Sequence, residues 1–148
     1  ENPSLYLAAK GCDSAAAETD FLSALVAQSG CGLLLDVNNI FVTCQNLGWN
    51  RDDYLRGLPL EAIGEVHLAG HASDVDASGT QVLIDNHGGP VAPEVWAIYQ
   101  DLLTASGPLP SLIEWDTNVP EWSVLQKECA KAEVILSRSS LPSKECVA

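Results

Sequence analysis

Three apolar segments decide the fold of this chain: LLLDVNN (33–39), EVHLAG (65–70) and SLIEWD (111–116). Each segment predicts a buried β-strand, because near-continuous apolar runs are typical of strands in a parallel sheet. Each apolar run also leads to an acidic or histidine side chain of the type that binds metals, and these candidates are Asp36, His67 and Glu114. Parallel α/β folds place their chemistry at the C-terminal ends of their strands. We therefore expect the three side chains to form one site.

The segments between these strands have helical patterns. Apolar residues at helical spacing predict helices over 18–29 and 93–106, a short helix within RDDYLRGLP (51–59), and a last helix that opens at Pro120. A polar loop, HASDVDASGT (71–80), leads into QVLID (81–85), which predicts a small extra strand or an ordered loop. This order of elements predicts one α/β domain, in which helices cover a parallel sheet.

We expect this domain to span 1–138 and to be followed by a flexible tail over 139–148, where Ser, Pro and Lys occur. The first residue is Glu1 and not Met, which indicates a chain cut from a longer protein. A closed eight-stranded α/β barrel usually needs about 200 residues or more, and 148 residues are short for one.

The chain is strongly acidic, with 20 Asp and Glu against 7 Lys and Arg and a net charge of −13. Such a surface repels phosphate backbones, so we expect no nucleic-acid partner. No apolar run has the length of a membrane helix, and the first residues lack the pattern of a signal peptide, so we expect a cytoplasmic protein without a membrane partner. The five cysteines are odd in number and include no C-x-x-C pair, which favours reduced thiols.

Charged side chains buried at neighbouring strand ends need a common partner, because an unpaired buried charge is costly. Side chains alternate between the two faces of a strand, so each of the three shares its face with an apolar or small neighbour, and Asp36 is expected to share its face with Asn38. A divalent cation is the simplest common partner. The alternative is a buried network of hydrogen bonds.

A further carboxylate and imidazole, Asp85 and His87, occur in DNHGG (85–89). Their spacing suits a metal site, but the same residues also form good turns. Glu1 could mark the end of another strand. Carboxylates and imidazoles without cysteine suit iron, manganese or zinc, and they leave coordination positions open for a substrate or dioxygen.

Four more polar residues each have two interpretations. His71 is either a ligand or, as we favour, a histidine of the loop beyond the strand. Asn38 and Asn39 either hydrogen-bond a ligand carboxylate or cap the following helix. Glu65 is either a buried support for the site or a salt-bridge partner within it.

Two tryptophans, Trp96 and Trp122, belong to the apolar stripes of predicted helices, and we expect both in the core. Other functional motifs are absent: the sequence has no G-x-S-x-G, no P-loop, no G-x-G-x-x-G and no H-E-x-x-H. Serine hydrolase, nucleotide-binding and zincin functions therefore have no support.

Seven sequence blocks carry a family resemblance: ENPSLY (1–6), GCGLLLDVNNIFV (30–42), NLGW (46–49), EVHLAGH (65–71), LIDNHGGPV (83–91), VWAIY (95–99) and LIEWD (112–116). In this order, across nearly the whole chain, they resemble the multinuclear non-haem iron-dependent oxidase family. These MbnB-like proteins were formerly labelled as a domain of unknown function. The chain is similar to the C-terminal half of such an enzyme.

The resemblance implies a TIM barrel of the (β/α)8 type, of which this chain would form the part from the end of strand 5 through strand 8 and the final helix. It implies two or three iron ions that act with dioxygen on cysteine residues of ribosomally made precursor peptides, and a partner protein that presents the peptide. By matching motif positions it assigns six iron ligands: Glu1, Asp36, His67, Asp85, His87 and Glu114. Two of these, Asp85 and His87, could instead move protons in the reaction.

Three functions stay open at this point. The first is an iron-dependent oxidase, as an activity of the full-length protein. The second is a hydrolase or isomerase on a similar barrel, which would use zinc or manganese to activate water or a sugar hydroxyl. The third is a truncated metal-binding domain without catalytic activity. Half a barrel has open sheet edges, so self-association with another copy is expected in that case.

Overall fold

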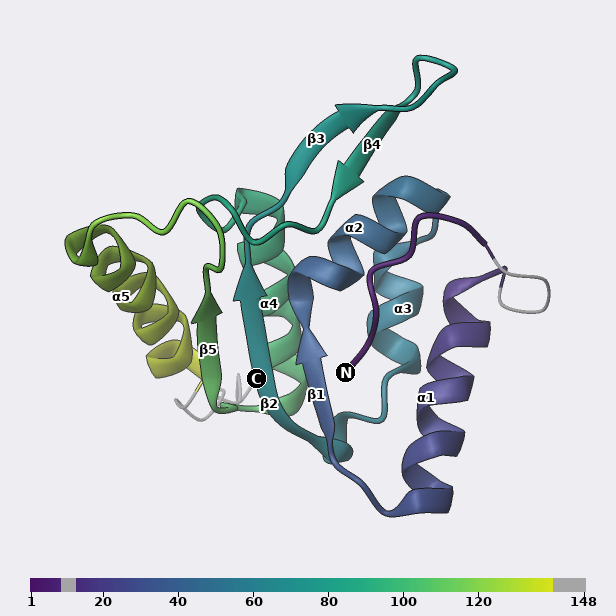
Figure 1. The fold of residues 1–148 in the computed structure, drawn as a ribbon. Helices are drawn as coiled ribbons and strands as arrows, with labels where there is room; N and C mark the ends of the chain where they lie inside the picture. The colour runs from purple at the N-terminus through teal and green to yellow at the C-terminus, as the bar shows by residue number, and fades with distance from the viewer. Residues whose placement is uncertain (9–12, 140–148) are drawn as a thin grey trace, which may run out of the picture.

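The computed structural model describes residues 1–8 and 13–139 (Figure 1). Of the predicted flexible tail, only Ser139 belongs to this part of the chain, where it ends the last helix. The rest of that tail, and the cysteines at positions 12 and 146, lie outside the described residues.

A three-stranded parallel sheet forms the centre of the fold, as predicted. Its strands are β1 (Leu33–Asp36), β2 (Ile63–Ala69) and β5 (Ser111–Glu114). They lie side by side in the order β1-β2-β5, and both pairs are parallel. All three C-terminal ends therefore meet at one edge of the sheet (Figure 1).

Helices surround this sheet: α1 (Ala15–Ser29), α2 (Val37–Leu47), α3 (Arg51–Gly57), the 3-10 turn η1 (Leu60–Ala62), α4 (Pro93–Ser106) and α5 (Trp122–Ser139). The helix predicted over 93–106 has the same bounds in the structure, because Pro93 suits the first helical turn and Gly107 follows the last one. The prediction of an α/β fold with a parallel sheet and helices is confirmed.

The strand predicted over 33–39 is wrong in its second half. The strand ends at Asp36, and α2 begins at the next residue. The Asp36 side chain accepts a hydrogen bond from the backbone N–H of Asn39 at 2.7 Å, so it caps the new helix. Asn38 is consequently helical, and its expected place on the strand face beside Asp36 is incorrect.

The hydrophobic core lies on the face of the sheet that α4 covers (Figure 1). Leu35, Val66 and Leu68 are fully buried there and belong to the same cluster as Ile98 and Leu102 of α4. The opposite face holds the residues with candidate chemistry and is less covered. Leu112 on β5 is 45% exposed.

Trp122 is not in the core, contrary to the prediction. It opens α5 and is 69% exposed, whereas Trp96 is partly buried and packs against the core cluster. The 3,4 spacing of α5 predicts an apolar face, but among the described residues no element covers the part of that face where Trp122 lies.

The segment between β2 and α4 forms a hairpin that stands away from the central sheet (Figure 1). β3 (Ala72–Val75) pairs with β4 (Gln81–Ile84) in antiparallel register. β4 agrees with the predicted extra strand, but β3 lies within 71–80, where the sequence predicts a polar loop. An amide clamp fixes the hairpin to α2: Asn46 donates to the Leu83 carbonyl at 2.9 Å and accepts from the Leu83 N–H at 2.8 Å.

Within the described part of the chain, no helix has both the length and the apolar character needed to cross a membrane.

Candidate metal centre

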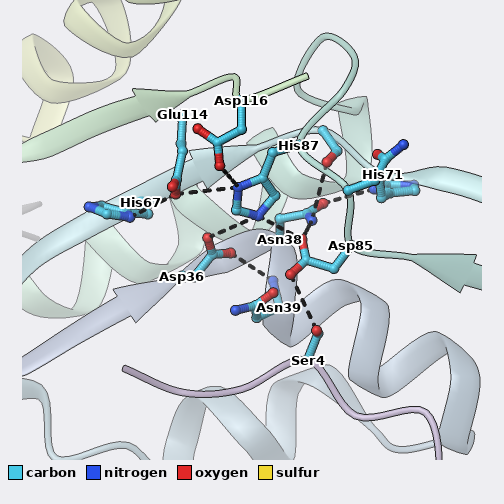
Figure 2. Close-up of polar contacts among 12 residues, drawn as sticks. Ser4, Asp36, Asn38, Asn39, His67, His71, Asp85, His87, Glu114 and Asp116 are labelled. Carbon is cyan, nitrogen blue, oxygen red and sulfur yellow. Dashed lines mark hydrogen bonds and ion pairs between the residues drawn. The ribbon is translucent and has the colours of Figure 1, made fainter. Parts of the chain in front are cut away.

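The register of the sheet brings the predicted strand-end residues together. Asp36 lies directly opposite His67 on the neighbouring strand, and Glu114 lies opposite Ala69, two residues further along β2. His67 Nδ1 is 2.9 Å from Glu114 Oε2 (Figure 2). Strand pairing alone thus gathers Asp36, His67 and Glu114 at one edge of the sheet.

Asp36 is fully buried, and the side chain of Asn2 holds its backbone through two hydrogen bonds. Asn2 donates from Nδ2 to the Asp36 carbonyl at 2.9 Å and accepts from the Asp36 N–H at 2.8 Å, as a neighbouring strand would. One carboxylate oxygen of Asp36 caps α2, while Oδ2 is buried without a hydrogen-bond partner among the described residues. The pKa of Asp36 is raised to about 7, chiefly by burial and also by the nearby carboxylates of Asp85 and Glu1, while the hydrogen bond from Asn39 and the charge of His87 oppose the shift.

Asp85 and His87 reach the same place from the loop that follows β4. His87 Nε2 lies 2.7 Å from Asp85 Oδ1 and 4.0 Å from Asp36 Oδ2, and His87 Nδ1 lies 3.5 Å from Glu114 Oε2 and 3.3 Å from Asp116 Oδ2 (Figure 2). Burial lowers the pKa of His87, but the carboxylates of Asp85, Glu114, Asp36 and Asp116 outweigh it and leave the pKa raised.

The backbone at His87 is unusual. Its φ of 47° lies in the left-handed region, which is uncommon for residues other than glycine. The backbone N–H of Asp116 donates to the His87 carbonyl at 2.9 Å and fixes this conformation. Such local strain is frequent at functional sites, where surrounding contacts hold a side chain in a required direction.

Two groups of side chains could each hold a metal ion: Glu1 with Asp36 and His67, and Asp36 with His87 and Glu114. Within each group the ligand atoms all lie within 4.8 Å of one another, and Asp36 belongs to both. Asp85 joins the cluster through its contact with His87. The structure therefore brings all six predicted residues together.

The polar atoms at the centre of this cluster fit a cation. Asp36 Oδ2 and His87 Nε2 are both buried and have no hydrogen-bond partner among the residues that the structure describes. The Asp85 oxygen is close to His87 Nε2, but the two atoms do not have hydrogen-bond geometry. Buried polar atoms without partners are rare in folded proteins. Here they lie 4.0 Å apart, and the carboxylates of Asp85 and Glu114 also contact His87, an arrangement that a divalent cation would satisfy.

Other polar residues support this cluster without joining it. Asn38 donates to Asp85 Oδ1 at 2.8 Å, which confirms its interpretation as a hydrogen-bond partner of a candidate ligand. His71 Nδ1 lies 2.8 Å from Asn38 Oδ1, so His71 contacts this supporting asparagine rather than the cluster of candidate ligands. Burial lowers the pKa of His71, against the effects of Glu94 and Asp85.

Glu65 is not buried. Its side chain is 49% exposed, and Oε1 lies 3.7 Å from His67 Nε2. The interpretation as a buried support is therefore wrong, and the contact with His67 agrees with the alternative of a salt-bridge partner.

Sequence reasoning missed the roles of Asp116 and Asn2. Asp116 lies two residues after Glu114, and the alternation of a strand would have placed both on one side of the chain. No sequence pattern predicts the pairing of Asn2 with the Asp36 backbone, because this side chain takes the place of a neighbouring strand.

Comparison with known proteins identifies the family. Residues 1–137 match the model of the RiPP precursor modification enzyme family MbnB/TglH/ChrH. Similar proteins include a UPF0276 protein of Caulobacter vibrioides (strain NA1000 / CB15N), which is 52% identical over 137 residues that cover 93% of this chain and 48% of the relative.

A UPF0276 protein of Rhizobium meliloti (strain 1021) is 44% identical over 138 residues, which cover 93% of this chain and 44% of the relative. The chain thus spans about half the length of the curated relatives it matches. The match over nearly its whole length shows that this chain belongs to the MbnB/TglH/ChrH family of RiPP precursor modification enzymes.

Proposed function

We propose that the full-length protein to which this chain belongs is a non-haem iron oxidase that uses dioxygen to modify cysteine residues of a ribosomally made precursor peptide. Family membership supports the peptide-modifying part of this proposal. The observation that carries the metal-dependent part is the pair of buried atoms, Asp36 Oδ2 and His87 Nε2, that face one another without hydrogen-bond partners among the described residues.

The geometry supports two neighbouring metal positions. Glu1, Asp36 and His67 would hold one ion, while Asp36, His87 and Glu114 would hold the second. Asp36 belongs to both sets, so it is the natural shared carboxylate. Bound iron would supply Lewis acidity toward a cysteine thiol and electrons for dioxygen.

The residues of this chain also suit proton transfer. Asp85 and His87 lie in contact at the border of the cluster, and the pKa of His87 is raised by the surrounding carboxylates. A protonated imidazole beside a carboxylate can hold a proton and pass it on. We propose this role for the pair wherever it does not coordinate metal.

We further propose that residues 1–138 form part of a (β/α)8 barrel, from the end of strand 5 through strand 8. The strands follow one another in the sheet in chain order, they are parallel, and their C-terminal ends carry the candidate ligands. The relatives are about twice as long as the matched region, which leaves room for the other half. A partner protein that presents the peptide is part of the same proposal.

Metal analysis and oxygen consumption of the full-length protein test the proposal. Protein purified without oxygen should contain iron, and it should consume dioxygen when a cysteine-containing precursor peptide is added. Asp36→Asn should abolish both iron retention and oxygen consumption, because it removes a carboxylate charge from both metal positions. Glu121→Gln is the matched control, since it removes one charge from an exposed position before α5.

The same experiment separates the other two functions. Carboxylate and imidazole ligands also suit zinc and manganese, so a protein that holds zinc or manganese and consumes no dioxygen would be a hydrolase or an isomerase. A protein that binds metal but converts no substrate would be a non-catalytic metal-binding domain. Absence of iron from the anaerobic protein would overturn the oxidase.

A further inference from the structure

A cavity of about 460 Å³ lies beside the metal centre, between α2, the hairpin and the start of α4. Its lining includes Phe41, Gln45, His71, Gln81, Leu83 and Glu94. Phe41 and Leu83 supply apolar walls, whereas the two glutamines and Glu94 supply oxygen atoms that accept hydrogen bonds. The cavity is open to solvent on one side, and it has the size of a small-ligand site.

Hydrogen bonds connect this cavity to the metal centre. His71, which lines the cavity, bonds to Asn38 at 2.8 Å, and Asn38 donates to Asp85 at 2.8 Å. Figure 2 shows Asn38 joined by dashed lines to both His71 and Asp85. A molecule that extends from the cavity would therefore have its next segment close to Asp85 and His87.

The charge of this region favours a cationic occupant. No lysine or arginine occurs in the sequence between Arg56 and Lys127, so none lines the cavity. Glu94 forms no salt bridge with a lysine or arginine of the described ranges 1–8 and 13–139, and it acts electrostatically on His71, whose pKa burial lowers. The hairpin adds the exposed carboxylates of Asp74 and Asp76. An acidic site without a lysine or arginine, beside a histidine whose pKa is lowered, attracts positively charged ligands.

The chemistry of the lining fits a long basic side chain. The aromatic ring of Phe41 can contact a cation through its face, and its apolar surface, together with that of Leu83, can cover an aliphatic stem. Glu94 and the glutamine side-chain carbonyl oxygens can accept the N–H groups at the end of that stem. A carboxylate ligand would meet Glu94 as a like charge.

We propose that this cavity, which we call the hairpin pocket, binds a lysine or arginine side chain of an extended peptide and so positions the neighbouring peptide residues at the metal centre. The assignment of that peptide to the substrate rests on the proposed function. The class of ligand does not, because it follows from the lining and its charge.

Binding of short synthetic peptides tests the pocket directly. The probes are acetylated pentapeptides Ala-Ser-X-Ser-Ala amide, in which X is lysine, arginine, norleucine or glutamate. They are titrated into the isotope-labelled full-length protein with EDTA present, and amide NMR shifts are followed. The lysine and arginine peptides should bind about tenfold more tightly than the norleucine peptide, because a charge-assisted hydrogen bond adds that much. The shifts should centre on Phe41, His71 and Glu94.

Two substitutions at one position sharpen the test. Glu94→Gln should weaken the lysine peptide about tenfold, and Glu94→Lys should make the glutamate peptide bind better than the lysine peptide. Glu94 is exposed, so neither variant should unfold the chain, and circular dichroism verifies this. Glu121→Gln, which changes the net charge by the same amount as Glu94→Gln, should leave every affinity unchanged.

Equal affinity of the norleucine and lysine peptides would overturn the proposal, as would an unchanged affinity in Glu94→Gln or shifts centred away from the pocket. Failure of the two proposals is distinguishable, because the peptides are titrated without metal. A selective pocket in a protein without iron would contradict the oxidase alone. An iron protein with an unselective pocket would contradict this inference alone.

Discussion

Asp36 uses its two carboxylate oxygens differently. Oδ1 accepts the backbone N–H of Asn39 and starts α2, while Oδ2 points toward His87 without a hydrogen-bond partner in the described part of the chain. The same residue therefore ends a strand, begins a helix and faces the candidate metal centre. This coupling means that a change of charge at Asp36 should alter the stability of the chain, and its sign can be predicted.

The metal-free chain should lose stability as the pH rises. The pKa of Asp36 is raised from 3.8 to about 7 in the folded state, so the folded state binds this proton more tightly than the unfolded state does. The free energy of unfolding should therefore fall between about pH 4 and pH 7, by on the order of 4 kcal/mol from this group. The raised pKa of His87 acts in the same direction, because its stabilisation is lost as the imidazole loses its proton.

Asp36→Asn should remove most of this pH dependence. Asparagine caps a helix as well as aspartate does, so the start of α2 is kept while the buried titration is lost. Urea unfolding of both proteins with EDTA, at pH 5 and pH 8, measures the difference. The variant should be the more stable protein at pH 8. If the free energy of unfolding fell equally with pH in both proteins, the raised pKa of Asp36 would be contradicted.

A second residue, Gly70, lets the loop that carries Asp85 and His87 pack closely, because it has no side chain. A Cβ atom at this position would lie 2.2 Å from the Gly89 carbonyl oxygen, and backbone atoms cannot move away at low cost. Gly70→Ala should therefore displace the loop, destabilise the chain by about 1–3 kcal/mol and weaken metal binding. Thermal unfolding and a manganese titration measure the two effects.

The matched control for this change is Gly89→Ala, in the same loop. A Cβ atom at Gly89 would meet no atom within 4 Å. The control should keep the metal affinity of the unchanged chain. If both variants bound metal equally well, the close contact at Gly70 would not position the loop.

Among the elements, the β3–β4 hairpin is held against α2 by the side-chain amide of Asn46. The Asn46 side chain forms two hydrogen bonds with the backbone of Leu83, and Leu83 is the buried residue of β4. Asn46→Ala should leave a buried backbone group without its partner, at a cost of about 1–3 kcal/mol. The hairpin should then open more often, and amide hydrogen exchange over residues 72–84 should accelerate while exchange in β2 stays unchanged. Gln100→Ala, on the exposed side of α4, is the control and should change neither.

Sequence patterns predicted those elements for which hydrophobic spacing and the residues at the two ends indicate the same structure. The helix α4 has an apolar stripe, a proline in its first turn and a glycine after its end, and its predicted bounds were correct. The three parallel strands were predicted because their apolar runs are nearly continuous, which is typical of strands in a parallel sheet. Their C-terminal ends then indicated Asp36, His67 and Glu114.

Sequence patterns failed to predict those parts of the structure that tertiary contacts determine. β3 is exposed along most of its length, so its residues show no apolar alternation. α2 follows β1 without a loop, and the apolar Val37 is compatible with either element until the cap at Asp36 is known. The support from Asn2 arises between segments distant in sequence, and no local pattern encodes it.

At the scale of the whole molecule, one face of the sheet and the outer edge of β5 are left open by the residues that the structure describes. Leu112 is 45% exposed on the face that carries the metal centre, and Trp122 is 69% exposed near β5. On its outer side β5 has no partner strand among the described residues. Such an edge beside apolar side chains is a template for pairing with another chain, which natural proteins usually cover.

We therefore predict that this chain associates with itself through the β5 side of the sheet. Sedimentation at rising micromolar concentration should show dimers or larger species, because pairing would cover both Leu112 and the strand edge. Leu112→Lys should shift the chain to monomers, since it would bury a charge without a partner in the new interface. Val134→Lys, at a similarly exposed apolar position on α5, is the control and should associate like the unchanged chain. A monodisperse monomer at all concentrations would contradict the prediction, and equal association of both variants would place the interface elsewhere.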